Sequence, residues 1–483
     1  MKKARKSDSF GTANIILFLK LLDKDELKEF GKFVCSPFHN NRTEVSRFFD
    51  EIKIFHPEFT GEDFTKEEIF KKLYPKEKYR DDVVRRLSSN LFKLGEEYGA
   101  YKNYRENKFD FEKNLLHFYF SKNAEKFFPK QLNKSEELLD NQDQRDTEYF
   151  LRHSMLNEIE RNYMLKYDPT YKKSGFEKQI INLWKHLLSS MLRLYGFAEF
   201  EIFFFNKKYE LNYSQELLKI AEDSNFMDSK AIEIYYLILK LYGKDKNDKD
   251  FARVKSLIKE NISIFDRGEC FNLYIHLFNY CNINKLEKGT DYSKVEFEIS
   301  REMVEQELLI NNGVVDPGWF RGIFFKAFNA GETDFGGEFI EKYKSKVSGN
   351  DSENVVNHAY AQLAMHEKDY DRALDFLSTA TYQHINDKWL IKNMYLKIYY
   401  ETGRHEQFFY TVDSIRHLIK EEGSWNENLI TPIRNFITYC TKLFRIKLRE
   451  IDTPVDEVKQ EILNSKVIGR PWLLEKAEEL EKS

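Results

Sequence analysis

The sequence predicts an all-α protein: an α-solenoid of stacked helical hairpins, with an N-terminal helical unit and a C-terminal capping helix. Three observations predict this class. The 483 residues include only 9 Pro and 20 Gly, too few for the many turns of a β-sandwich or barrel. The long segments between these breakers carry apolar residues at a 3.6-residue period, which indicates amphipathic helices. The links between the segments are short and polar, so neighbouring helix pairs must stack to bury their apolar sides.

The N-terminal part of the chain predicts a tail and a compact helical unit. Residues 1–9 are polar and basic and are expected to be a disordered tail, and residues 10–105 are expected to form an N-terminal helical domain. Its first helix carries apolar residues over 15–22. Asp23 then offers an N-cap for the second helix, and Glu26, three residues later, completes a capping-box pattern.

Four further signals place the other helices of this unit. The second helix must stop before Pro37, because the residue that precedes a proline avoids the α region. Thr43 and Pro57 bracket a third helix, and Thr65 is a predicted N-cap for a fourth. Asp81 begins a long fifth helix.

Residues 106–452 are predicted to form the solenoid, and a repeat is visible within them. Phe335, Tyr370 and His405 each follow a polar turn and open a predicted helix, at intervals of 35 residues. The chain here resembles the tetratricopeptide repeat family, whose unit is a helical hairpin of about 34 residues. The resemblance covers roughly 320–420.

One copy matches the family pattern best, and it runs over 357–380. Ala361 stands where the family prefers glycine. Ala373 and Ala380 fill the two positions at which helices touch most closely, and Leu377 fills the large apolar position between them. The resemblance implies a helix-turn-helix unit that packs side by side with its neighbours.

The resemblance also implies a partner-binding groove along the first helix of each hairpin, where such families bind peptides. Carried over by position, the groove would present His358, Gln362, His366, Asn393, Lys397 and Glu401. The family's clamp for C-terminal carboxylates has Lys and Asn at the first two positions, where this chain has His and Gln. This departure argues against recognition of chaperone tails, and ordinary solvated residues remain the alternative reading.

A second candidate surface lies on the predicted helix at 81–99. Its polar side carries Arg85, Arg86, Ser89, Asn90 and Lys93, residue types that contact phosphates or base edges when a helix enters a groove of DNA or RNA. Acidic residues flank the same helix, so a solvated face explains the pattern without any ligand. A nucleic-acid-associated regulator is therefore the alternative function.

Sequence motifs for catalysis and for metal or phosphate binding are missing. None of the 11 histidines follows an acid by three residues, and the chain has no His-Glu-x-x-His, phosphate-loop or nucleophile-elbow motif. We therefore expect no metal, no cofactor and no catalysis. The expected function is a non-catalytic scaffold or adaptor that binds another protein or peptide.

Charge and cysteine content predict the compartment in which the chain is found. With 76 basic and 80 acidic residues, a net charge of −4, it has no overall electrostatic footprint for nucleic acid or anionic membranes. Four distant cysteines are typical of an intracellular protein with free thiols, and no run of about 18 apolar residues predicts a membrane span. We expect a cytoplasmic protein. Residues 453–483, with helix-starting prolines at 454 and 471, are the predicted capping helices.

Overall fold

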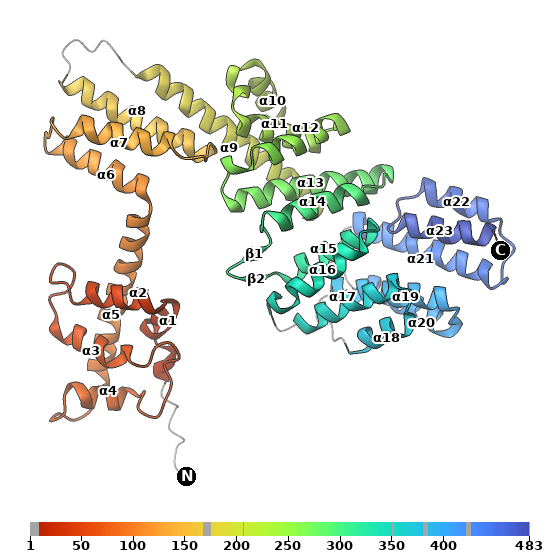
Figure 1. Cartoon of the computed structure of the whole chain (residues 1–483), viewed down its shortest axis with the longest axis horizontal. Coiled ribbons are helices and arrows are strands. Elements are labelled where there is room, and N and C mark those ends of the chain that lie inside the picture. Colours follow the sequence, from red (N-terminus) through yellow and green to blue (C-terminus); the bar gives the residue numbers. More distant parts are fainter. Residues whose placement is uncertain are drawn as a thin grey trace. The chain divides into compact units, whose positions relative to one another are not determined.

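The structure is a computed structural model that describes residues 9–167, 175–205, 207–349, 352–379, 385–421 and 427–482. It is 77% helical with about 1% strand, and the described residues form 23 α-helices in which consecutive helices pack on one another (Figure 1). The predicted all-α, solenoid-like fold is confirmed.

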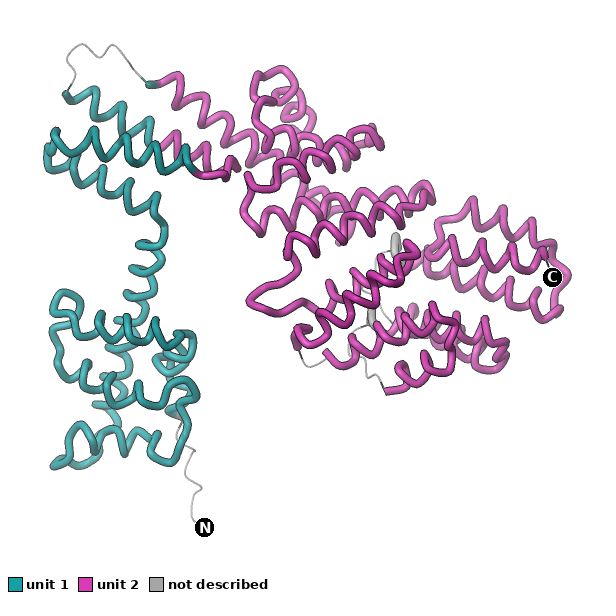
Figure 2. The backbone as a smooth tube through the Cα atoms, in the orientation of Figure 1, with its two compact units in different colours: residues 1–141, 156–175 teal, residues 142–155, 176–483 magenta. Residues whose placement is uncertain are grey.

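The chain divides into two compact units (Figure 2). Unit 1 comprises residues 1–141 and 156–175, and unit 2 comprises 142–155 and 176–483. Helix α8 (Thr147–Tyr167) contributes to both units. Residue 105, the predicted end of the N-terminal domain, lies inside unit 1, whose first segment continues to residue 141.

One apolar core of unit 1 has all its buried members between Phe10 and Tyr98, inside the predicted N-terminal domain. The capping box is confirmed: the Asp23 carboxylate accepts the backbone N–H of Glu26 at 2.8 Å, and the Glu26 carboxylate accepts that of Asp23 at 2.9 Å. Thr65 caps the fourth helix as predicted. The helices are α1 (Asn14–Leu21), α2 (Lys24–Val34), α3 (Thr43–Lys53), α4 (Lys66–Leu73), α5 (Asp81–Glu106), α6 (Lys108–Ser121), α7 (Phe128–Asp140) and α8 (Thr147–Tyr167), with a 3-10 turn at Ser9–Thr12.

Unit 2 holds the stacked hairpins. Each pair of helices packs on the next pair, so a continuous apolar cluster extends from Leu188 in α9 to Ala359 in α17. The helices are α9 (Phe176–Phe205), α10 (Ser214–Asp223), α11 (Lys230–Tyr242), α12 (Asp248–Glu260), α13 (Arg267–Lys288), α14 (Ser293–Glu305), α15 (Pro317–Asn329), α16 (Thr333–Tyr343), α17 (Ser352–His366), α18 (Tyr370–Ser378), α19 (Ile385–Thr402), α20 (His405–Glu421), α21 (Glu427–Lys447), α22 (Val455–Asn464) and α23 (Arg470–Glu481), with 3-10 turns at Asn225–Asp228, Ile262–Ile264 and Lys344–Lys346.

The predicted repeat positions open second helices of hairpins. Tyr370 is the first residue of α18 and His405 the first residue of α20, while Phe335 is the third residue of α16. Ala361 and Ala373 are fully buried where α17 and α18 meet. Ala380 lies outside the described residues. Helices in neighbouring pairs are compatible with a helical-repeat fold.

A short β-hairpin between α14 and α15 was not predicted. Strands β1 (Ile310–Asn311) and β2 (Val314–Val315) are antiparallel, and Asn312 and Gly313 form the turn with φ values of 50° and 80°. Asn-Gly at positive φ in both central positions is the preferred two-residue hairpin turn. The sequence therefore carried a signal for this hairpin.

The C-terminal helices close the stack. Helix α23 packs on α21 and α22, with Leu473 and Ala477 fully buried, and Pro471 lies in its first turn. Three of the four free cysteines are buried and Cys35 is exposed. No helix in the described part of the chain is long and apolar enough to cross a bilayer.

Candidate functional site

The first helices of successive hairpins in unit 2 contact one another, which sets the geometry of the candidate site. Helix α17 packs on both α15 and α19. Helices α13 and α15 meet through the indole of Trp319, whose centroid lies 4.9 Å from the Phe271 ring and 6.2 Å from the Phe278 ring. A segment bound along these helices would therefore meet several hairpins at once.

Nitrogen-bearing side chains lie over aromatic rings at these helix contacts and where α19 meets the C-terminal helix α23. The Lys326 ammonium of α15 is 4.6 Å from the centre of the Phe278 ring of α13, and the Lys397 ammonium of α19 is 5.2 Å from the Trp472 ring of α23. The His366 ring of α17 lies 4.9 Å from the Phe328 ring of α15. We call these six residues the nitrogen–aromatic row: Phe278, Lys326, Phe328, His366, Lys397 and Trp472.

Lys326 has no carboxylate partner within the described residues. Glu296, the carboxylate whose charge acts on Lys326, forms an ion pair with Lys285 at 2.7 Å. Within the described residues Lys326 makes no ion pair, and burial lowers the pKa of its ammonium. A cation over an aromatic face gains an attraction that grows when the site is desolvated.

Lys397 and Glu401, both predicted groove residues of α19, are covered by the C-terminal helix. Glu401 accepts an ion pair from Lys476 of α23 at 2.8 Å. Burial lowers the pKa of Lys397, whose ammonium faces the indole of Trp472 instead of an acid. These two positions therefore hold the cap in place and do not form an open groove.

Lys476 is the centre of this contact. Its side chain is 6% exposed, and its ammonium lies within 3.0 Å of carboxylate oxygens of Glu401, Glu475 and Glu479. Burial alone would lower the pKa of Lys476, but the three carboxylates outweigh burial and raise it. The charge of Lys476 is thus neutralised within the chain.

His358 was predicted on the groove surface, and this placement is corrected by the structure. The residue is only 2% exposed, and its ring packs 5.3 Å from the Phe325 ring and 5.9 Å from the Phe324 ring. Burial, and then the positive charge of Arg321, lower the pKa of His358 to about 3. Its neutral imidazole belongs to the contact between α15 and α17.

The other predicted groove residues differ in accessibility. Gln362 is half-buried on α17, and His366 at the end of the same helix is exposed. Partial burial, and then the charge of Lys397, lower the pKa of His366. Asn393 of α19 is half-buried, and its side-chain oxygen has no hydrogen-bond partner among the described residues. The accessible part of the site is thus on α15 and α17.

Several residues of the nitrogen–aromatic row were not predicted from the sequence. They lie on helices outside the best repeat copy. Phe278 and Lys326 precede it by 30 to 80 residues, and Trp472 follows it by about 90. Lys326 stands in the strongly apolar stretch Phe324–Phe328, and a lone lysine within such a stretch was the available signal.

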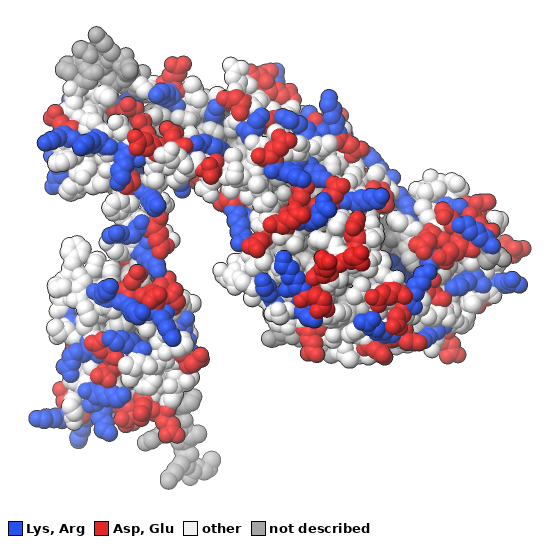
Figure 3. Space-filling view, viewed as in Figure 1, with Lys and Arg blue, Asp and Glu red and all other residues white. Residues whose placement is uncertain are grey.

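The alternative surface on α5 is partly neutralised within unit 1. Arg85 forms an ion pair with Asp81, and Arg86 pairs with Glu44 at 3.5 Å. Ser89 and Lys93 are exposed, whereas Asn90 is half-buried and its amide nitrogen lacks a partner among the described residues. On the face drawn in Figure 3, acidic and basic side chains alternate over both units.

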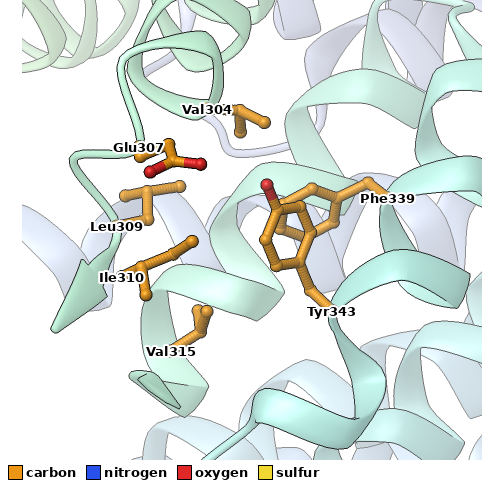
Figure 4. Close-up of a pocket in the computed structure, with 7 residues that line it drawn as sticks. All are labelled: Val304, Glu307, Leu309, Ile310, Val315, Phe339 and Tyr343. Carbon is orange, nitrogen blue, oxygen red and sulfur yellow. The ribbon is translucent and has the colours of Figure 1, made fainter. Parts of the chain in front are cut away.

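A small hollow beside the β-hairpin has an apolar lining. About 180 Å³ of space lies among Val304, Glu307, Leu309, Ile310, Val315, Phe339 and Tyr343, with the Glu307 carboxylate and the Tyr343 hydroxyl at one side (Figure 4). This volume includes space open to solvent, and the hollow leaves no room for a water molecule, so it is not a ligand cavity. In the described ranges no three His, Cys, Asp or Glu side chains are grouped to hold a metal ion.

Comparisons with known proteins give no family assignment. No family model, no curated protein and no solved structure matches the chain. The tetratricopeptide likeness therefore remains a resemblance in residues and in helix pairing.

Proposed function

We propose that the chain is a non-catalytic scaffold that binds a segment of another protein along α13, α15 and α17. The observation that supports this proposal is the nitrogen–aromatic row at the contacts between first helices. In this row the half-buried residue Lys326 and the exposed residue His366 lie over the Phe278 and Phe328 rings, and Lys326 makes no ion pair within the described residues. Interface centres are enriched in aromatic residues, and a charged group buried there needs a partner of opposite charge.

The bound segment carries at least one acidic side chain in this proposal. The Lys326 ammonium lacks an ion-pair partner in the described chain, and a carboxylate placed over the Phe278 contact would supply one. Pairs of this kind are strengthened where water is excluded. Gln362, half-buried beside His366, offers amide groups for the backbone of the segment.

The test compares two charge reversals in the full-length chain. Lys326→Glu alters the proposed site, and Lys342→Glu alters an exposed lysine on second helix α16 with the same change in net charge. Partners are captured from the native host and quantified for wild type and both variants, after circular dichroism shows equal helix content. We expect Lys326→Glu to weaken capture of a specific partner by about 30-fold, the effect of a hot-spot loss of about 2 kcal/mol.

Equal partner sets from the two variants would contradict the proposal. A protein that is lost with Lys342→Glu and kept with Lys326→Glu would move the site to the second helices. The alternative role in nucleic-acid binding stays a prediction, and the ion pairs of Arg85 and Arg86 do not favour it.

A further inference from the structure

Helix α9 exposes a line of large apolar side chains along one side. Each of them is between 45% and 57% exposed. Leu188, Leu192 and Gly196 are buried on the opposite side of the helix, which packs on α11. We call the exposed line the α9 seam: Phe176, Ile180, Leu183, Trp184, Leu187 and Leu194.

The spacing of the seam is that of a coiled coil. Phe176, Ile180, Leu183, Leu187 and Leu194 follow alternating steps of four and three residues, and Ser190 fills the remaining position. This 3.5-residue repeat keeps one side of a helix against a second helix over its whole length. Helix α9 has 30 residues, about 45 Å of helix, so it offers three heptads to a partner helix.

Two cations of α9 are already paired inside unit 2. Lys185 pairs with Asp228 at 3.0 Å, and Arg193 pairs with Glu269 at 2.9 Å. None of the six seam residues is charged. A second uncharged seam of the same kind is the complementary surface, and another copy of this chain carries one.

We propose that two copies of the chain associate through antiparallel pairing of their α9 helices. A twofold axis crosses the pair at the level of residue 185. In this register Leu183 faces Leu187 of the second copy, Phe176 faces Leu194, and Ile180 faces the small Ser190. Each pair of facing side chains then combines a larger residue with one that is smaller or of equal size, as close packing requires. Parallel pairing would instead set Phe176 against Phe176 and leave a gap between two serines.

The area of the seam suits a dimer contact. Six side chains about half exposed present about 600 Å² of apolar surface, if each offers about 200 Å² when fully exposed. A standard-size interface buries about 800 Å² per partner, and apolar patches above a few hundred Å² mark interaction surfaces. The seam supplies most of that area before its polar rim is counted.

The first experiment measures the mass of the full-length chain by light scattering and sedimentation over a range of concentrations. We expect a dimer for wild type and a monomer for Leu183→Glu with Leu187→Glu, at unchanged helix content. Leu17→Glu with Leu21→Glu is the matched control, since these α1 residues are also i and i+4 and are 50% and 79% exposed. The control should remain a dimer. A monomeric wild type, or a dimer that survives the α9 substitutions, would overturn the proposal.

The second experiment tests the register by disulfide formation with copper phenanthroline as oxidant, in a Cys35→Ser background that removes the exposed native thiol. Two thiols lose two hydrogens to the oxidant and form one S–S bond between copies. Trp184→Cys should cross-link readily, because the two positions are about 3 Å apart along the axis, whereas Phe176→Cys places them about 27 Å apart. Faster cross-linking of Phe176→Cys would refute the antiparallel register.

Discussion

Lys476→Met is expected to loosen the C-terminal helix from α19. In the native chain the Lys476 ammonium is 2.8 Å from Glu401 and is buried, with a 6% exposed side chain. The substitution keeps the length of the side chain but leaves the Glu401 carboxylate, 18% exposed, without its cation. A carboxylate left without its partner in a poorly hydrated place lowers stability, because water cannot reach it to replace the lost interaction.

The expected cost is about 2 kcal/mol. Removing one partner of a fully buried pair costs about 3–5 kcal/mol, and this range is reduced here because Glu475 and Glu479 are 60% and 55% exposed and stay solvated. A change of about 2 kcal/mol in the opening free energy corresponds to about 30-fold faster exchange of the amides of α23.

Hydrogen-exchange mass spectrometry on a peptide covering 470–481 measures this opening. Glu479→Gln is the control on the same helix and should change exchange less than about threefold, since its carboxylate is mostly exposed. Adding Glu401→Gln to Lys476→Met should restore most of the protection by removing the unpaired charge. Exchange of Lys476→Met within threefold of wild type, or no recovery in the double variant, would refute the reasoning.

Three further predictions follow from buried groups. Burial holds the pKa of His358 near 3, below its unfolded value of about 6.5, so the unfolded chain binds more protons and the free energy of unfolding falls as pH drops below 6.5. In urea titrations, His358→Gln should reduce the loss of unfolding free energy between pH 6.5 and 5.0 by about 2 kcal/mol. Equal losses in wild type and variant would contradict this. Gly336→Ala should destabilise the chain by about 1–3 kcal/mol, because an added Cβ would lie 2.4 Å from the Phe328 ring. Gly337→Ala should be neutral or stabilising, because its added Cβ would have nothing within 4 Å. A higher melting temperature for Gly336→Ala than for Gly337→Ala would contradict the packing described here. An aromatic disulfide reagent should label one thiol per native chain, at exposed Cys35, since the pKa of Cys281 is raised by burial to about 12; rapid labelling of all four would contradict the buried assignments.

Local signals in the sequence predicted local structure well. The Asp23 capping box, the Thr65 cap and the helix starts at Tyr370 and His405 depend on residues within a few positions of one another, and all are confirmed. The β-hairpin was not predicted although Asn312-Gly313 is a strong turn signal, because its strands have only two residues each and lie between two helical segments.

The candidate site was harder to predict, because it depends on contacts between distant helices. Helical periodicity places His358 on a face of α17, but its burial comes from Phe324 and Phe325 of the preceding hairpin. Glu401 is likewise paired with Lys476, 75 residues later in the chain. Position within a repeat therefore predicts which side chains face a groove, and not which of them another helix covers.

The most direct test of the proposed scaffold is site-specific photo-cross-linking in the native host. A benzophenone amino acid replaces Gln362 on first helix α17 or Lys342 on second helix α16, in full-length chains. The account predicts a defined partner adduct at position 362 that disappears when Lys326→Glu is added, and no such adduct at position 342. Adducts of equal yield at both positions, or an adduct at 362 that is unaffected by Lys326→Glu, would contradict it.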